Sequence, residues 1–188
     1  GDWSSDVCSS DLEAISEISG QEIPEVTDTQ IDLPINAFIP ATWILNREEK
    51  LEAYKSATEC SNNDELTELA SDWVNRYGNL PKPVESLIMI MRLKLLAKKC
   101  GFNKIKLKKP NILIETKLKN STFKMLKNSL ASSVQNKFNF NEGEQLSIIT
   151  IRGLGATEIQ NQIDQLILWF GSFEREIKNF DKELIKRE

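Results

Sequence analysis

The chain has 188 residues, of which 40% are hydrophobic, and its formal net charge is −4. This length supports one ordinary hydrophobic core with appended segments, rather than two full domains. No apolar run approaches the roughly 20 residues that a membrane-spanning helix needs, and no basic and apolar leader begins the chain, so we expect a cytoplasmic protein.

Residue types exclude the commonest catalytic chemistries. The chain has no His, and its cysteines, Cys8, Cys60 and Cys100, are widely spaced. A Cys/His zinc site or a His-based triad therefore cannot form, and we expect isolated reduced thiols. The paired carboxylates at 48–49 and 64–65 fall in first helical turns, where the helix dipole favours negative charge. We expect no catalytic residue, cofactor or metal in this fragment.

Charge is distributed unevenly along the chain. Residues 1–86 carry 5 Lys/Arg and 18 Asp/Glu, residues 87–127 carry 12 and 1, and the remainder carries 7 and 9. Such blocks either neutralise one another in the fold or face oppositely charged partners.

The first 40 residues predict little regular structure. Residues 1–12, GDWSSDVCSSDL, contain a near-duplication and no amphipathic period, so we interpret them as a non-native, adapter-like tail. Prolines within 20–40 indicate an extended linker, and Pro34–Pro40 is compatible with an edge strand.

Three helices follow. Asn46 and Asn62 each precede a Glu by three residues, a spacing typical of capping boxes, and Gly78 is expected to end the second helix. Pro83 suits the first turn of the third helix, which is apolar around most of its circumference and should be the most buried. The predicted apolar faces are Leu51, Tyr54 and Thr58 in the first helix and Leu66, Leu69, Trp73, Val74 and Tyr77 in the second.

After Gly101 the apolar pattern alternates. It predicts a hairpin of strands 103–108 and 111–116, a short helix capped by Ser121, a second hairpin of strands 134–140 and 145–151, and one long helix from Thr157. The predicted fold class is α+β: an N-terminal segment of three helices, then a small antiparallel sheet of two hairpins with a short and a long C-terminal helix.

Two stretches raise the question of anion binding. IRGLGATE, at 151–158, lacks the Gly-Lys-Ser/Thr of a P-loop and the third Gly of a dinucleotide motif, so we interpret it as a tight connection with Arg152 beside it. The basic block at 92–127 includes Lys104, Lys106 and Lys108, which share one face of a strand. They are candidate nucleic-acid contacts, although a solvated sheet face has the same pattern.

Two segments carry a family resemblance. They are IDLPINAFIPATWILNREEKLEAYKSA, at 31–57, and ELTELASDWVNRYGNLPKPVESLIMIMRLKLLAKKCGFNKI, at 65–105. They resemble the C-terminal domain of bacterial transcription-repair coupling factors, in which a start of the type IDLP…AYIP precedes a helical hairpin of the type DRFGPLPEEVENLL…ARLKLLA. The resemblance implies that 13–30 are the end of a motor module and its linker, and that 31–188 form the C-terminal domain.

The resemblance also implies a role. The parent would be an ATP-dependent DNA translocase, with ATP and Mg in its motor module, that displaces stalled RNA polymerase and recruits UvrA. No Walker A motif occurs in this chain, so the fragment itself would have no ATPase activity. It would be a regulatory, protein-interaction domain that packs on the UvrB-like module of the same protein and masks its UvrA-binding surface.

Position within the matching motif assigns the contact with the UvrB-like module to Asp72 and Asn75. These residues lie one turn apart on the helix before the turn at Arg76-Tyr77-Gly78, called the RYG turn below. We expect both on the face opposite Leu69 and Trp73. Asn75 replaces the Asp that is usual in this family, and a charged hydrogen bond is stronger than a neutral one. The alternative function is a nucleic-acid-binding module that uses the basic block.

Overall fold

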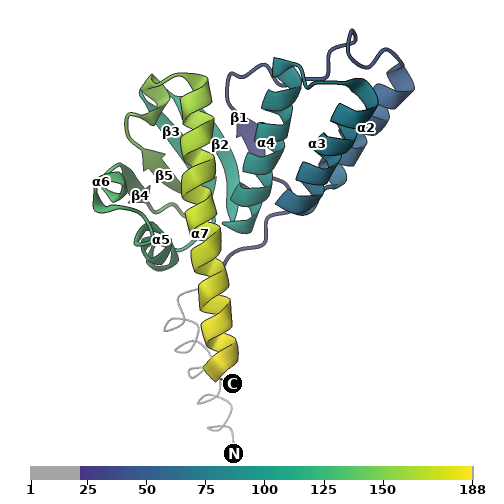
Figure 1. The fold of residues 1–188 in the computed structure, drawn as a ribbon. Coiled ribbons are helices and arrows are strands. Elements are labelled where there is room, and N and C mark those ends of the chain that lie inside the picture. The colour runs from purple at the N-terminus through teal and green to yellow at the C-terminus, as the bar shows by residue number, and fades with distance from the viewer. Residues whose placement is uncertain (1–21, 188) are drawn as a thin grey trace, which may run out of the picture.

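The computed structural model describes residues 22–187, and the adapter-like tail predicted at 1–12 lies outside them. The elements in chain order are β1 (Gln30–Asp32), α2 (Arg47–Glu59), α3 (Asn63–Tyr77), α4 (Lys82–Lys99), β2 (Phe102–Lys108), β3 (Asn111–Thr116), α5 (Asn120–Lys127), α6 (Ser132–Gln135), β4 (Phe138–Asn141), β5 (Ser147–Ile151), the 3-10 helix η1 (Leu154–Ala156) and α7 (Ile159–Arg187). This arrangement confirms the predicted α+β class (Figure 1).

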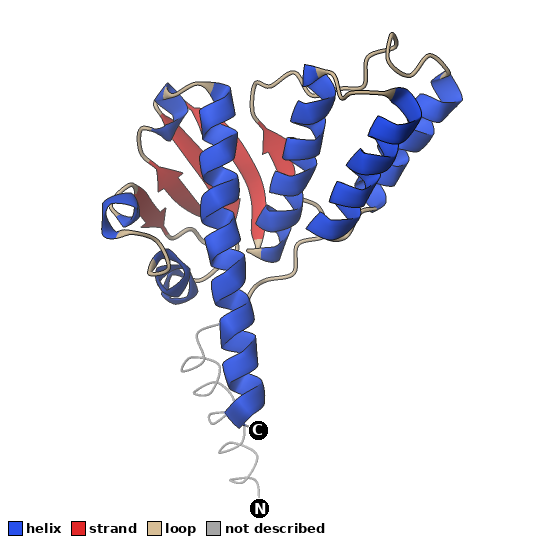
Figure 2. Ribbon diagram, viewed as in Figure 1, coloured by secondary structure: helices blue, strands red, loops and turns tan. Residues whose placement is uncertain are grey.

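The strands form one five-stranded sheet with the order β1-β2-β3-β5-β4. The two hairpins pair as antiparallel strands, as predicted, and β3 joins them through β5. Helices α4 and α7 lie over one face of this sheet (Figure 2).

The sheet is mixed, which corrects the prediction of a purely antiparallel sheet. Strand β1 pairs with β2 in parallel, with Gln30 opposite Lys104. The strand predicted at Pro34–Pro40 is wrong, because the edge strand ends before it. The Ile35 N–H donates to the Leu33 carbonyl at 2.8 Å, so the chain turns at Pro34, which has no N–H to offer a ladder.

Two other predicted boundaries are wrong. Helix α5 begins at Asn120 with Lys119 at its N-cap, so Ser121 lies within the first turn instead of capping it. Residues 132–135 form the short helix α6, and β4 starts only at Phe138. Helix α6 is tied to the preceding loop by the Gln135 side chain, whose Nε2 donates to the Leu130 carbonyl at 2.7 Å, a contact that a sequence pattern does not reveal.

The capping predictions for the first two long helices are confirmed. The Asn46 side chain accepts hydrogen bonds from the N–H groups of Glu48 and Glu49, at 2.8 and 3.2 Å. The Asn62 side chain accepts one from the Glu65 N–H at 2.8 Å. These bonds fix where α2 and α3 begin, and therefore which residues face each other.

Helix α4 separates two hydrophobic cores and supplies side chains to both. Val84, Leu87 and Ile88 pack into the helical core with α2 and α3. Leu93 and Ala97 pack into the sheet core. This confirms that the third helix is the central one, since a helix that is apolar on most sides must be covered on most sides.

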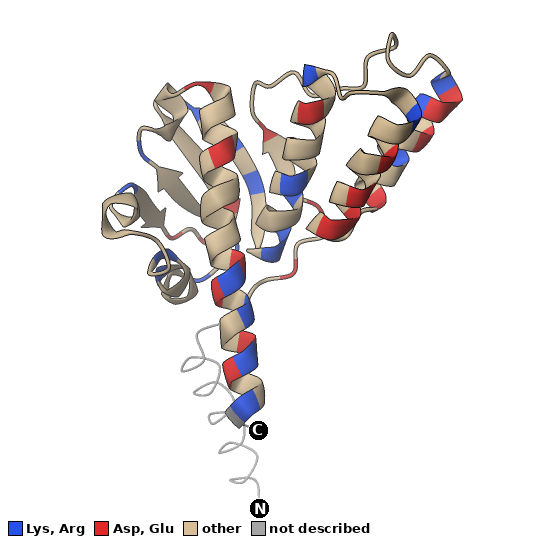
Figure 3. Cartoon of the chain, viewed as in Figure 1, with Lys and Arg blue, Asp and Glu red and all other residues tan. Residues whose placement is uncertain are grey.

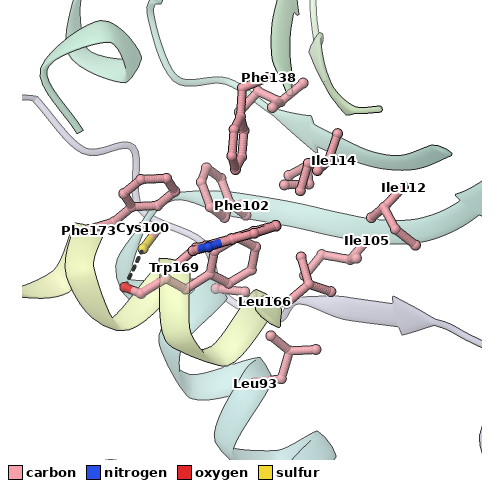
Figure 4. Close-up of a cluster of buried hydrophobic side chains, with 14 of the residues drawn as sticks. Leu93, Cys100, Phe102, Ile105, Ile112, Ile114, Phe138, Leu166, Trp169 and Phe173 are labelled. Atoms are coloured by element: carbon pink, nitrogen blue, oxygen red, sulfur yellow. Dashed lines mark hydrogen bonds between the residues drawn. The ribbon is translucent and has the colours of Figure 1, made fainter. Parts of the chain in front are cut away.

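The sheet core is dominated by aromatic rings (Figure 4). Phe102 from β2 contacts Phe170 and Phe173 from α7, with ring centroids 4.9 and 6.3 Å apart. Phe138 from β4 lies 5.5 Å from Trp169 in an edge-on arrangement. Such pairs bury large areas and favour one packing geometry, so α7 has a defined position on the sheet.

The buried face of α2 differs from the prediction. Ala53 and Ala57 are buried, whereas Leu51 is 60% exposed. The small side chains let α2 approach its neighbours closely, and the phase of the helix then leaves Leu51 in solvent.

Two Leu→Ala substitutions test this assignment of the helical core. Leu66 in α3 is 0% exposed, so Leu66→Ala should lower the free energy of unfolding by about 2–5 kcal/mol, because it removes buried methyl groups and leaves a cavity. Leu51→Ala, the matched control, should change it by no more than about 0.5 kcal/mol. Urea denaturation followed by circular dichroism measures both, and similar losses for the two variants would contradict the packing described.

Candidate partner-binding surface

The first predicted site residue, Asp72, lies on the exposed side of α3. Its carboxylate is 3.8 Å from Arg76 Nη1, and both side chains are 56% exposed. An ion pair with this exposure and i,i+4 spacing contributes little to stability. The Asp72 carboxylate therefore remains available to a cation from another surface.

Asn75 is exposed one turn further along the same helix. The prediction placed Asp72 and Asn75 together on the face opposite Leu69 and Trp73. Asp72 instead borders the same groove as those two residues, because residues three positions apart are neighbours on a helix surface. Asn75 is not part of the groove lining.

The groove lies between α2 and α3 and has a volume of about 300 Å³. It is lined by Glu48, Glu49, Glu52, Ala53 and Ser56 from α2 and by Leu69, Asp72, Trp73, Arg76 and Tyr77 from α3. Four carboxylates and one guanidinium give it a net negative charge. Acidic residues are prominent along both helices (Figure 3).

An aromatic cluster holds the α3 side of the groove in place. The Trp43 ring lies 6.2 Å from Trp73, edge to face, and 5.4 Å from Tyr77. The Arg76 guanidinium lies 5.2 Å from the centre of the Tyr77 ring, which is within cation–π range. These contacts order the base of the groove and one of its charged side chains.

The RYG turn positions α3 relative to α4. Gly78 has φ of +90° and donates its N–H to the Val74 carbonyl at 2.9 Å, which ends α3. Pro83 lies in the first turn of α4, and its carbonyl accepts the Phe38 N–H at 3.2 Å. The turn sets the orientation of α3 and contributes no reactive group to the surface.

Sequence reasoning missed the contribution of α2. Glu48 and Glu49 were interpreted only as first-turn carboxylates, and Glu52 was not singled out. Their i, i+3 and i+4 spacing places them on one side of α2, and the small residues Ala53 and Ser56 that follow them indicate a close helix–helix approach. This combination of acidic and small residues on α2 is the sequence feature from which the groove could have been predicted.

The three predicted nucleic-acid contacts share the sheet face that α4 and α7 do not cover. Lys104, Lys106 and Lys108 alternate along β2, so they point to the same side. Lys106 Nζ lies 3.3 Å from the Glu115 carboxylate of β3. Asp32 of β1 is the register partner of Lys106. This face therefore carries charges of both signs.

The Gly-rich turn after β5 is a close-packed connection, as interpreted from the sequence. A Cβ atom on Gly155 would lie 2.5 Å from the Asn111 carbonyl oxygen. The Gly153 N–H donates to the Asn111 side chain at 3.2 Å, and the Arg152 guanidinium donates to the Asn136 carbonyl. The Gly153 N–H and the Arg152 guanidinium are therefore engaged within the protein.

Cys60 and Cys100 are free cysteines, and Cys8 lies outside the described residues. Cys100 is fully buried, and this burial raises the pKa of its thiol. Burial and the nearby carboxylates of Glu65 and Glu59 raise the pKa of the Cys60 thiol as well. Both thiols are thus less nucleophilic at neutral pH than a free cysteine.

Within residues 22–187, no group of three or more His, Cys, Asp or Glu side chains is placed to hold a metal ion. None of the helices that the structure describes combines the length and apolar character required to cross a bilayer.

Comparison with known proteins identifies the family. The TRCF domain family matches residues 33–126, which is half of the chain. The chain belongs to the TRCF domain family. This membership confirms the resemblance derived from residues 31–105.

Relatives of the TRCF domain include three transcription-repair-coupling factors. The Bacillus subtilis protein is 34% identical over 87 residues, which cover 46% of this chain and 7% of that protein. The Staphylococcus epidermidis protein is 30% identical over 104 residues, which cover 54% of this chain and 9% of that protein. The Mycobacterium tuberculosis protein is 32% identical over 81 residues, which cover 43% of this chain and 7% of that protein. The chain thus spans less than a tenth of the length of these curated relatives.

A solved structure shares the fold. The crystal structure of the C-terminal domain of a transcription-repair coupling factor has a TM-score of 0.64 and 19% sequence identity to this chain, covering 81% of it and 95% of the solved chain. The likeness extends beyond the residues that the TRCF domain family matches.

Two glycine substitutions test the geometry of the RYG turn. Gly78→Ala should cost about 1 kcal/mol of stability, because φ of +90° strains a residue with a Cβ although nothing lies within 4 Å of it. Gly171→Ala, in the middle of α7, is the matched control and should raise stability by about 0.5–1 kcal/mol. Thermal and urea unfolding measure both changes, and a neutral Gly78→Ala would contradict the left-handed turn.

Proposed function

We propose that this TRCF domain is the regulatory, protein-interaction domain of a transcription-repair coupling factor, and that it masks the UvrA-binding surface of the UvrB-like module in the same protein. Residues 31–188 would form the domain, and 13–30 would connect it to the motor module. The observation that carries the proposal is the acidic surface of α3, which is exposed and ordered by packing and belongs to a domain of this family.

The parent protein would supply the activity. ATP and Mg would bind in its motor module, which would translocate on DNA and displace stalled RNA polymerase. The domain described here would hold the UvrB-like module closed until the parent engages polymerase, and its release would then permit UvrA recruitment. Only the regulatory contact would belong to these residues.

The chemistry of α3 suits a reversible intramolecular contact. Basic residues of the UvrB-like module would pair with Asp72 and with the carboxylates that line the α2–α3 groove. Exposed ion pairs are individually weak, but covalent connection within one protein gives a high effective concentration. A weak contact can therefore keep the module closed and still open when polymerase binding competes.

Asn75 moderates this contact. An amide donates and accepts neutral hydrogen bonds, whereas the carboxylate usual at this position forms a charge-assisted one, which is about twice as strong. The masked state of this protein would then be less stable than that of family members with Asp at this position.

Charge reversal on α3 tests the proposal. Asp72→Lys should weaken binding of the chain to a separately produced UvrB-like module by about tenfold, equivalent to about 1.4 kcal/mol, and Asn75→Asp should strengthen it several-fold. Asp164→Lys makes the same charge change on an exposed position of α7 and should have no effect. Calorimetry at several salt concentrations measures the affinities, which should fall as salt rises. Equal affinities for the wild-type chain and Asp72→Lys at low salt would rule out the electrostatic contact.

The second candidate function is nucleic-acid binding through β2, and it is favoured by the clustering of Lys104, Lys106 and Lys108 on the open sheet face. The pairing of Lys106 with Glu115 reduces the positive charge available there. If this face binds DNA, replacing all three lysines by Gln should abolish retention of duplex DNA in filter binding at moderate salt and reduce its salt dependence. Lys55, Lys82 and Lys137 replaced by Gln provide a control with the same net charge. Identical retention by the two triple variants, or none by the wild-type chain, would discard this function.

A further inference from the structure

Helix α7 carries an apolar stripe with the period of a coiled coil. Its members are separated alternately by four and three residues: Ile159, Ile163, Leu166, Phe170, Phe173, Ile177, Phe180 and Leu184. An average spacing of 3.5 residues keeps one narrow seam facing a packed neighbour. The repeat continues without interruption over almost the whole of α7 (Ile159–Arg187).

The domain itself fully covers only the first part of this seam. The seam residues Ile163, Leu166, Phe170 and Phe173 are buried in the sheet core. Beyond it, α7 projects past the rest of the fold (Figure 1). Ile177 and Phe180 are half-buried, next to Ile23 and Leu126, and Leu184 is 40% exposed. The domain therefore covers Ile177 and Phe180 in part, and Leu184 is the seam residue most open to solvent.

The residues beside the seam change where it leaves the body. Within the core, the flanking positions include Ile167 and Trp169, which pack against the sheet core. Past Phe173 the flanking residues on both sides of the seam are acidic, namely Glu174, Glu176, Asp181 and Glu183, whereas the basic residues Arg175, Lys178, Lys182 and Lys186 lie on the outer positions. The charged bands of this part of α7 are visible in Figure 3. Charged flanks beside a narrow apolar seam are typical of helix–helix recognition.

Glu174 shows how such a flank is used inside the fold. Its carboxylate lies 2.8 Å from Lys178 Nζ on α7 itself and 3.7 Å from Lys99 Nζ, at the C-terminal end of α4, which packs against α7. A neighbouring helix thus supplies a cation to the edge of the seam. A helix that covers the last turns would satisfy Asp181 and Glu183 in the same way.

We propose that the last turns of α7, from Ile177 to Leu184, bind an amphipathic helix of a partner protein whose apolar stripe is flanked by Lys and Arg. A second copy of this chain is a poor occupant, because its acidic flanks would face those of the first copy in either relative direction. The N-terminal residues 1–21 are also a poor occupant, since they contain five acidic residues and no Lys or Arg. The surface is remote from the α2–α3 groove (Figure 1), so both partners can bind at once.

The experiment uses the full chain and two synthetic helical peptides, each about three heptads long. Both carry Leu at the seam positions; one has Lys at the flanking positions and the other has Glu. Fluorescence anisotropy should show binding of the Lys peptide that weakens with salt, and at least about tenfold weaker binding of the Glu peptide. Comparable affinities for the two peptides, or binding of neither, would overturn the proposal.

Two matched pairs of variants locate the contact. Leu184→Ser should weaken binding of the Lys peptide about tenfold, whereas Ile185→Ser should leave it unchanged, since Ile185 is 72% exposed but lies outside the seam. Glu183→Gln should weaken binding several-fold and reduce its salt dependence, and Lys182→Gln should do neither. Circular dichroism checks that every variant keeps its helix content. Equal effects within each pair would contradict a seam-specific contact.

Sedimentation equilibrium and a truncation distinguish the other occupants. The proposal requires a monomeric chain, and deletion of residues 1–20 should not change binding of the Lys peptide. A dimer that Leu184→Ser dissociates would assign the seam to a second copy instead. Binding that appears only after the deletion would assign it to the N-terminal segment. The Asp72 surface is unchanged in all these variants, so the masking function is tested separately.

Discussion

The packing of α4 is the constraint on which the rest of the domain depends. One side of this helix forms part of the helical core with α2 and α3, and its C-terminal half forms part of the sheet core with β2 and α7. The position of α3 relative to the sheet therefore depends on its packing against α4, across a turn that contains Gly78 and Pro83. Because the acidic surface lies on α3, the orientation of this surface is determined by how α4 is buried.

The charge asymmetry of the chain becomes interpretable in the fold. Among the described residues, one ion pair joins the acidic first block to the basic second block, between Asp28 and Lys94 at 3.3 Å. Pairs such as Lys55–Glu59 and Lys82–Glu85 stay within a single block or helix. The two blocks thus do not neutralise one another. Most of their charge faces outward, which is the arrangement expected of surfaces that select partners by charge.

The sequence was most informative where structure is determined locally. The side chains of Asn46 and Asn62 cap helices by accepting hydrogen bonds from backbone N–H groups only two or three residues away, and the long stripe of α7 is a property of one segment. These features could be predicted because no distant residue decides them. The fold class followed from their order.

Features that depend on distant residues were not predictable in the same way. The parallel pairing of β1 requires Gln30 to meet Lys104, and nothing within Gln30–Asp32 specifies that strand. The exposure of Leu51 depends on how closely Ala53 and Ala57 approach neighbouring helices. The groove beside Asp72 likewise needs carboxylates from α2, so the pattern of α3 alone identified only part of it.

The role of α7 in the sheet core has a consequence for what can fold alone. The family match ends at residue 126, before α7 begins, yet Phe170 and Phe173 close the core over Phe102. A polypeptide limited to the matched residues would lack the α7 side chains that cover the sheet beside α4, and we expect that it would not form an independent folding unit. The part of this chain that the family model matches is therefore smaller than the part whose side chains pack into one core.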